Sequence, residues 1–254
     1  MGIVSLLAAE TRMTLWSMKR YMFNTVSMVV VMYVIFIGMF WGVKSIAGEN
    51  MQAGSLDSMV VGYVLWMSAM FALQGTGGIV LEESQRGTLE QLYLSPLGSE
   101  LIFLSKAILA TLFNFFFITV LLYLAMLTTG RYHSVNLPYF YGMLLMSLLS
   151  LNGIGFMMGG IGLIHKRVNA VYGIISFGMI GLMLLPVYPF TTYSLLPFLA
   201  GARTINAQIT GEATFPAWWY LYIAANSIFY LAVGILVFRL FEKRARKLNK
   251  LGQY

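Results

Sequence analysis

The chain has 254 residues, of which 59% are hydrophobic and only 10% are charged, and its formal net charge is +7. Soluble domains contain about 25% charged residues, so this composition predicts a polytopic membrane protein and excludes a soluble fold. The absence of cysteine excludes disulfides and thiolate metal sites, and two distant histidines, His133 and His165, disfavour a histidine metal site. We expect no metal and no nucleic acid partner, because basic cytoplasmic loops explain the positive charge.

The first 21 residues are predicted to form an interfacial helix. Residues 3–21 fit an amphipathic helix that lies at the membrane surface. Its basic residues would lie among headgroups and its large apolar residues would turn inward: Arg12, Lys19 and Arg20 in the first group, and Leu6, Leu7, Leu15 and Trp16 in the second. A signal peptide is disfavoured because Glu10 and Arg12 interrupt the first apolar run. The alternative is a plain cytoplasmic extension before the first span.

Six runs are long and apolar enough to cross a membrane, for which about 20 mostly apolar residues are needed. In chain order they cover residues 22–43, 58–81, 101–128, 138–164, 168–187 and 217–238. No soluble domain, low-complexity linker or internal repeat is visible. We therefore expect an all-α polytopic membrane protein in which residues 1–254 form a single domain with six transmembrane helices.

The distribution of Lys and Arg predicts the orientation of these spans. With the N-terminus inside, most of the 16 basic residues fall on the cytoplasmic side. They are Arg12, Lys19, Arg20, Arg86, Lys106, Lys166, Arg167, Arg239, Lys243, Arg244, Arg246, Lys247 and Lys250. Only Lys44, Arg131 and Arg203 remain outside. Both termini are therefore expected in the cytoplasm, with the basic tail 239–254 on anionic headgroups.

The interiors of the predicted spans lack charged residues, since Asp57 and Lys106 lie near span ends. This argues against a proton-driven carrier and against catalysis within the membrane, because both need ionisable groups there. No G-x-x-x-x-G-K-[ST] motif is present, so this chain does not bind ATP through a P-loop. The few polar residues inside the spans either line a translocation path or join helices by hydrogen bonds. The candidates for a path are Gln74, Asn114, Thr119 and Asn152.

Glycines four residues apart predict places where helices approach closely. Gly155 and Gly159 form such a pair in the fourth span, and Gly38 and Gly42 form another in the first. Both pairs are compatible with packing inside one bundle or across a dimer.

Residues 188–216 are too short and too rich in proline to form a further span. Pro189 and Pro197 break helices, and aromatic residues such as Tyr193 are typical of membrane interfaces. We expect two short re-entrant pieces that form an outer lid, with Pro189, Tyr193 and Pro197 as its marker residues. The alternative is a simple external loop.

The segment 82–98 is a compact charged element between the second and third spans. Gly87 allows a break, the sequence Thr-Leu-Glu-Gln from Thr88 to Gln91 matches a capping box, and Pro96 ends the helix. Leu89, Leu92 and Tyr93 share one face of this helix of about seven residues. Such a helix is unstable alone. It is held either by the membrane surface and adjoining spans, or by a partner groove in which these three residues are the anchors and nearby charges fix the register.

The sequence RGTLEQLYLSPLGS at 86–99 resembles the signature of type-2 ABC exporter permeases. In that family the element is a coupling helix that docks into a separate nucleotide-binding ATPase subunit. The resemblance implies that ATP and Mg are bound by that partner and that two permeases, identical or related, work with two ATPases in a prokaryotic cell membrane. The residues expected to couple to the ATPase are Glu82, Glu83, Arg86, Gly87, Thr88, Leu89, Glu90, Gln91 and Leu92.

Two functions remain from the sequence. The first is the permease subunit of an ATP-driven ABC exporter, which is not itself an enzyme and whose cargo is a drug, peptide, lipid or glycan. The second is a stand-alone six-span secondary carrier or channel, with sodium coupled through Asn114, Asn152 and hydroxyl groups. A tightly bound P-loop subunit would favour the first function, and ion-dependent uptake by the lone chain would favour the second.

Overall fold

The structure is a computed structural model that describes residues 3–47, 53–95, 98–132, 134–165, 168–211 and 214–248. Every element of regular structure in these ranges is helical. The helices are α1 (Ile3–Arg20), α2 (Met22–Ala47), α3 (Ala53–Gln85), α4 (Leu89–Tyr93), α5 (Ser99–Thr129), α6 (Leu137–His165), α7 (Asn169–Leu182), the short 3-10 helix η2 (Thr192–Leu195), α8 (Leu199–Thr210) and α9 (Ala217–Lys247).

Within the described residues, 5 helices are long and apolar enough to cross a membrane. They cover Met22–Ile46, Gly54–Gln85, Ser99–Thr129, Leu137–His165 and Ala217–Lys247. These ranges contain five of the six predicted runs in full. The prediction of an all-helical chain with several helices of membrane-crossing length is therefore confirmed.

The structure does not confirm a continuous fifth span over 168–187. The helix in this region, α7, has 14 residues and ends at Leu182, after which the chain forms turns. At 1.5 Å per residue it is about 21 Å long, shorter than a hydrocarbon core of about 30 Å. Proline disfavours helical backbone at the preceding residue, and Pro186 follows soon after the helix end.

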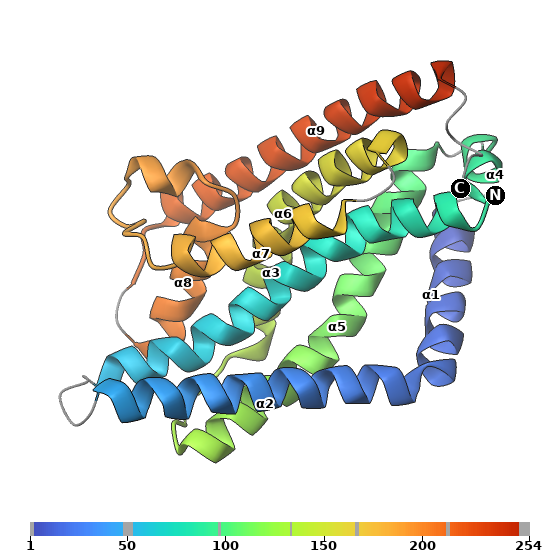
Figure 1. Cartoon of the computed structure of the whole chain (residues 1–254). Coiled ribbons are helices and arrows are strands. Elements are labelled where there is room, and N and C mark those ends of the chain that lie inside the picture. The colour runs from blue at the N-terminus through green and yellow to red at the C-terminus, as the bar shows by residue number, and fades with distance from the viewer. Residues whose placement is uncertain are drawn as a thin grey trace.

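Helix α6 lies in the middle of the bundle, with α3 and α9 packed against it (Figure 1). Helix α5 packs on α3, and α2 lies at the edge, against α3 and α5. The bundle has two distinct ends. The α4 end is where α3, α6 and α9 finish and α5 begins, and the α8 end is where α3 and α6 begin and α8 packs on both (Figure 1).

Helix α1 turns sharply away from α2 and runs across the α4 end of the bundle (Figure 1). Leu15 and Trp16 of α1 have exposed fractions of 52% and 64%. An apolar surface of this kind suits a helix that lies in a membrane interface. The interfacial position itself stays a prediction.

The described part of the segment between α7 and α9 contains two short helices, η2 and α8. Helix α8 packs closely on the bundle, since Asn206 donates from its Nδ2 to the Ser58 carbonyl at 3.0 Å. The fully buried Trp219 donates from its Nε1 to the Thr204 hydroxyl at 2.7 Å. Tyr193 is 44% exposed, so η2 lies on the outside of this region. The proposed re-entrant lid remains a prediction.

Candidate functional site

The charged element begins where α3 ends, and its backbone follows the predicted break. Gly87 has a φ of 71°, which places it in the left-handed region where glycine carries no steric cost. Its amide donates to the Ser84 carbonyl at 3.3 Å, which closes the end of α3. Helix α4 follows and has five residues, two fewer than the sequence predicted. Pro96 and Leu97, and the side chains of Glu90 and Tyr93, lie outside the described residues.

Thr88 has a different hydrogen-bond partner from the one that a capping box predicts. Its hydroxyl donates to the Glu83 carboxylate and also to the Glu83 carbonyl, at 3.3 Å. The expected reciprocal partner, Gln91, is exposed. Thr88 therefore ties the turn before α4 back to the last turns of α3.

Leu89 attaches α4 to its own bundle. Its side chain is 1% exposed and belongs to one apolar cluster, with Leu92 packed against it from outside. The other buried members are Val80, Phe103, Phe156, Leu163, Phe238 and Ala245. Leu89 is therefore buried in a cluster with residues of α3, α5, α6 and α9, and its role as an anchor in a partner groove stays a prediction.

The outward side of the element carries Gln85, Arg86, Gly87, Gln91 and Leu94, all exposed. Leu94 is 86% exposed and lies beside the charged groups of this element. Sequence reasoning missed it, although helical spacing places Leu94 opposite Leu89.

The outward side also carries an exposed ion pair. The Arg86 guanidinium donates to Glu82 one turn earlier, and both side chains are more than half exposed. Such a pair contributes at most about 1 kcal/mol to stability. It is therefore available to exchange partners at a second surface.

A buried charged cluster lies directly behind this element. The Nζ of Lys106 on α5 is 2.6 Å from Oε1 of Glu83 on α3 and 3.7 Å from Oε1 of Glu10 on α1. The three side chains are only 12%, 11% and 15% exposed. Sequence analysis placed Lys106 near the cytoplasmic end of the third span, and no local pattern connects it with Glu10.

Burial shifts the ionisation of the α1 member of this cluster. Desolvation raises the pKa of the Glu10 carboxyl above its ordinary value, and the Glu83 charge raises it further. The Lys106 ammonium acts in the opposite direction, but less strongly than the burial does. One ammonium therefore serves two carboxylates, of which Glu83 is the closer.

Among the described contacts, no hydrogen bond joins one of the four predicted path residues to another. Asn152 is fully buried, and its Oδ1 accepts a hydrogen bond from the Thr76 hydroxyl at 2.8 Å. The Thr119 hydroxyl donates to the Phe115 carbonyl at 2.6 Å and pairs with the Tyr141 hydroxyl. These bonds join α6 to α3 and α5 to α6. Gln74 on α3 and Asn114 on α5 are partly buried. The translocation path stays a prediction.

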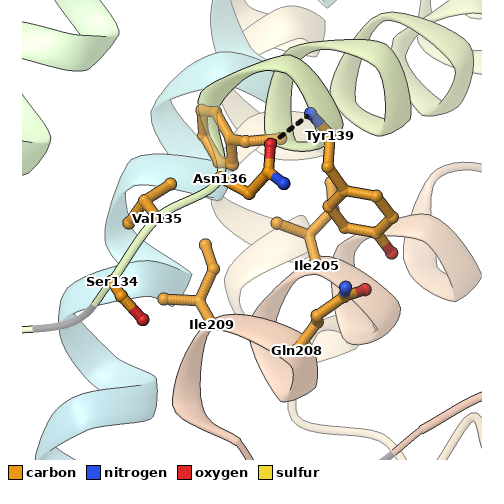
Figure 2. A pocket seen from close by; sticks show the side chains of 8 residues that line it. Ser134, Val135, Asn136, Tyr139, Ile205, Gln208 and Ile209 are labelled. Carbon is orange, nitrogen blue, oxygen red and sulfur yellow. Dashed lines mark hydrogen bonds between the residues drawn. The ribbon is translucent and has the colours of Figure 1, made fainter.

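Figure 2 shows a small pocket at the α8 end, between the start of α6 and α8. Its volume is about 120 Å³, well below the 300 Å³ or more of typical ligand pockets. Asn136 accepts a hydrogen bond from the Tyr139 amide at 3.3 Å and so caps α6, while Gln208 and Ile205 come from α8. The pocket is distant from the charged element and is too small to act as a substrate chamber.

No protein-family model matches the chain, and no curated protein matches it significantly. The class that fold and composition define is a multi-pass helical membrane protein. The best-defined candidate site in it is the α4 element with the buried charges behind it.

Proposed function

We propose that this chain is the membrane permease subunit of an ATP-driven ABC exporter and that α4 couples it to a separate ATPase subunit. The observation that carries the proposal is the α4 element itself. It is a very short helix, fixed from behind by Leu89 and by the buried charges, with a mixed apolar and charged face left outward.

The construction of this element supports a docking role. A five-residue helix has no stability of its own, so the bundle must hold it in place. A rigidly held exposed face loses little conformational entropy when a partner binds, which favours affinity. Leu94 provides an apolar anchor, and Arg86 and Glu82 provide charges that can set the register.

The proposal includes the arrangement of the chain in the membrane. The α4 end faces the cytoplasm together with both termini, and α1 lies in the inner interface. The segment that starts with α7 completes a sixth crossing, and η2 with α8 forms the outer lid. A second permease, either a copy or a related chain, completes the path, and ATP and Mg are bound by the ATPase subunits.

Binding measurements on two matched leucines test this function. The chain is purified from its native membranes, the co-purifying nucleotide-hydrolysing subunit is identified, and its affinity for variants is measured in nanodiscs. Leu94→Ala is expected to weaken binding by about tenfold, the effect of losing one apolar anchor. Arg86→Glu is expected to weaken it and to reduce ATP turnover. Leu184→Ala, at a leucine that is 84% exposed elsewhere in the chain, is the control and should bind normally.

Two results would contradict the proposal. One is an unchanged affinity and ATP turnover in both Leu94→Ala and Arg86→Glu. The other is the absence of any ATPase subunit combined with ion-dependent uptake by the chain alone, which would favour the stand-alone carrier.

A further inference from the structure

Lys106 is the only described side chain that contacts acidic groups of both α1 and α3. Its ammonium reaches Glu83 at 2.6 Å and Glu10 at 3.7 Å, and the second oxygen of Glu83 accepts the Thr88 hydroxyl. A continuous chain of polar contacts therefore runs from α1 through α5 and α3 to the turn before α4.

Burial makes this chain of contacts stronger than the ion pair beside it. Charges attract more strongly where water is excluded, and removal of one member leaves its partner buried and unpaired. The adjacent pair of Glu82 and Arg86 is 58% and 53% exposed and is screened by solvent. Glu82 and Glu83 are adjacent residues of α3, so the exposed pair of Glu82 serves as a control for the buried pair of Glu83.

Helix α1 has few other attachments to the bundle. None of its described side chains belongs to the buried apolar clusters, and its main contacts in the described part of the chain are with α5 and α2. The buried Glu10 provides a polar link from α1 to Lys106 on α5. We therefore expect α1 to move together with Lys106, the residue that contacts Glu10.

We propose that Lys106 is a positioning residue that ties α1 to the turn before α4, so that the two elements move as one unit. The inference rests on the proposed function only for the force that displaces α4, which the ATPase subunit would supply. The link itself is a property of the isolated chain. Movement of α4 passes through Thr88 and Glu83 to Lys106, and from there to α1, which runs across the same end of the bundle (Figure 1).

A distance measurement in the isolated chain tests the link without any ATPase. The chain has no cysteine, so Ser17→Cys on α1 and Gln91→Cys on α4, both at exposed positions, label specifically with nitroxides. Pulsed electron–electron double resonance in nanodiscs then gives the distribution of the distance between the two nitroxide labels. We expect Lys106→Met to broaden this distribution by about twofold or more, because α1 becomes free to move as a weakly attached terminal element.

Matched variants separate the link from general damage. Lys106→Arg keeps the charge and should keep a narrow distribution, and Glu82→Gln should leave it unchanged. Glu10→Gln removes only the α1 arm and should broaden it even if Lys106→Met fails to fold. The triple reversal E10K/E83K/K106E restores opposite charges and should narrow the distribution again.

An unchanged distribution in both Lys106→Met and Glu10→Gln would overturn the link. So would a triple reversal as broad as Lys106→Met. Failure of the proposed function is seen separately, as an unchanged ATPase affinity and turnover in both Leu94→Ala and Arg86→Glu, and it leaves these distances unaffected.

Discussion

Helices α6 and α2 carry glycine pairs with the same four-residue spacing, but only α6 uses its pair to pack against another helix. A Cβ added at Gly159 would lie 3.2 Å from the Val80 side chain and 3.4 Å from the Gly77 Cα of α3. A Cβ added at Gly38 or Gly42 would meet no atom of the described residues within 4 Å. The spacing therefore permits close approach, but the presence of a neighbour decides whether close approach occurs.

The α6 surface has a second close contact on its other side. A Cβ at Gly153 would lie 2.6 Å from the Tyr230 carbonyl carbon of α9, and one at Gly234 would lie 2.6 Å from the Gly153 Cα. Helix α6 is thus held between α3 and α9 by backbone-to-backbone contact. Helix α6 is therefore covered on two sides, and 67% of its most apolar stretch is buried, against 11% for α2.

The largest expected effect is at Gly153. Gly153→Leu forces the backbones of α6 and α9 apart, because no side-chain rotation can relieve a clash with main-chain atoms. We expect a loss of about 3 kcal/mol or more in the free energy of unfolding, measured by denaturant titration in detergent micelles.

The matched control for Gly153→Leu lies on the same helix. A Cβ at Gly142 would meet nothing within 4 Å, so Gly142→Leu should unfold close to wild type. Equal stability of the two variants would show that the contact between α6 and α9 does not need glycine.

A smaller loss is expected at Gly159. Gly159→Ala places a methyl group 3.2 Å from Val80, a side chain that can shift by a few tenths of an ångström. We expect a net loss of about 1 kcal/mol in the same titration, after the gain from the better helix propensity of alanine. A gain in stability would mean that α3 and α6 are less tightly packed than their distances indicate.

The smallest expected effect is on α2. Gly42→Ala adds a methyl group in open space, so the chain should be unchanged or more stable by up to about 1 kcal/mol through helix propensity. Size-exclusion chromatography of the same variant reports association. A clear loss of stability at unchanged association would break the comparison, since it would reveal a neighbour of α2 within this chain.

The predictable parts of the fold are those written in local sequence. Runs of more than 20 apolar residues located the five long helices, because each must satisfy its backbone in lipid by its own hydrogen bonds. The run at 168–187 is equally apolar, yet its helix ends at Leu182. The composition of this run indicates only that it is hydrophobic. The length of α7 also depends on Pro186 and on the packing of the chain that follows.

The candidate site divides in a similar way. Gly87 predicted the break and the apolar stripe predicted a helix with two unlike sides. The apolar stripe of Leu89, Leu92 and Tyr93 does not indicate which surface covers it. In the structure Leu89 is buried in the bundle and Leu94 is exposed. The pairing of Lys106 with Glu10 and Glu83 joins three helices, and residues this far apart in sequence meet only through the packing of the whole bundle.

The sequence by itself determined that this is an all-helical, multi-pass chain with a compact charged element between its second and third long apolar runs, because hydrophobic length, glycine and proline act locally. The tertiary structure alone decided which glycine pair packs against another helix, which face of α4 is exposed, and which buried ammonium joins α1 to α3. These depend on the neighbours that the folded bundle brings to each surface, and the physical terms involved, steric contact and charge attraction without water, exist only once those neighbours are in place.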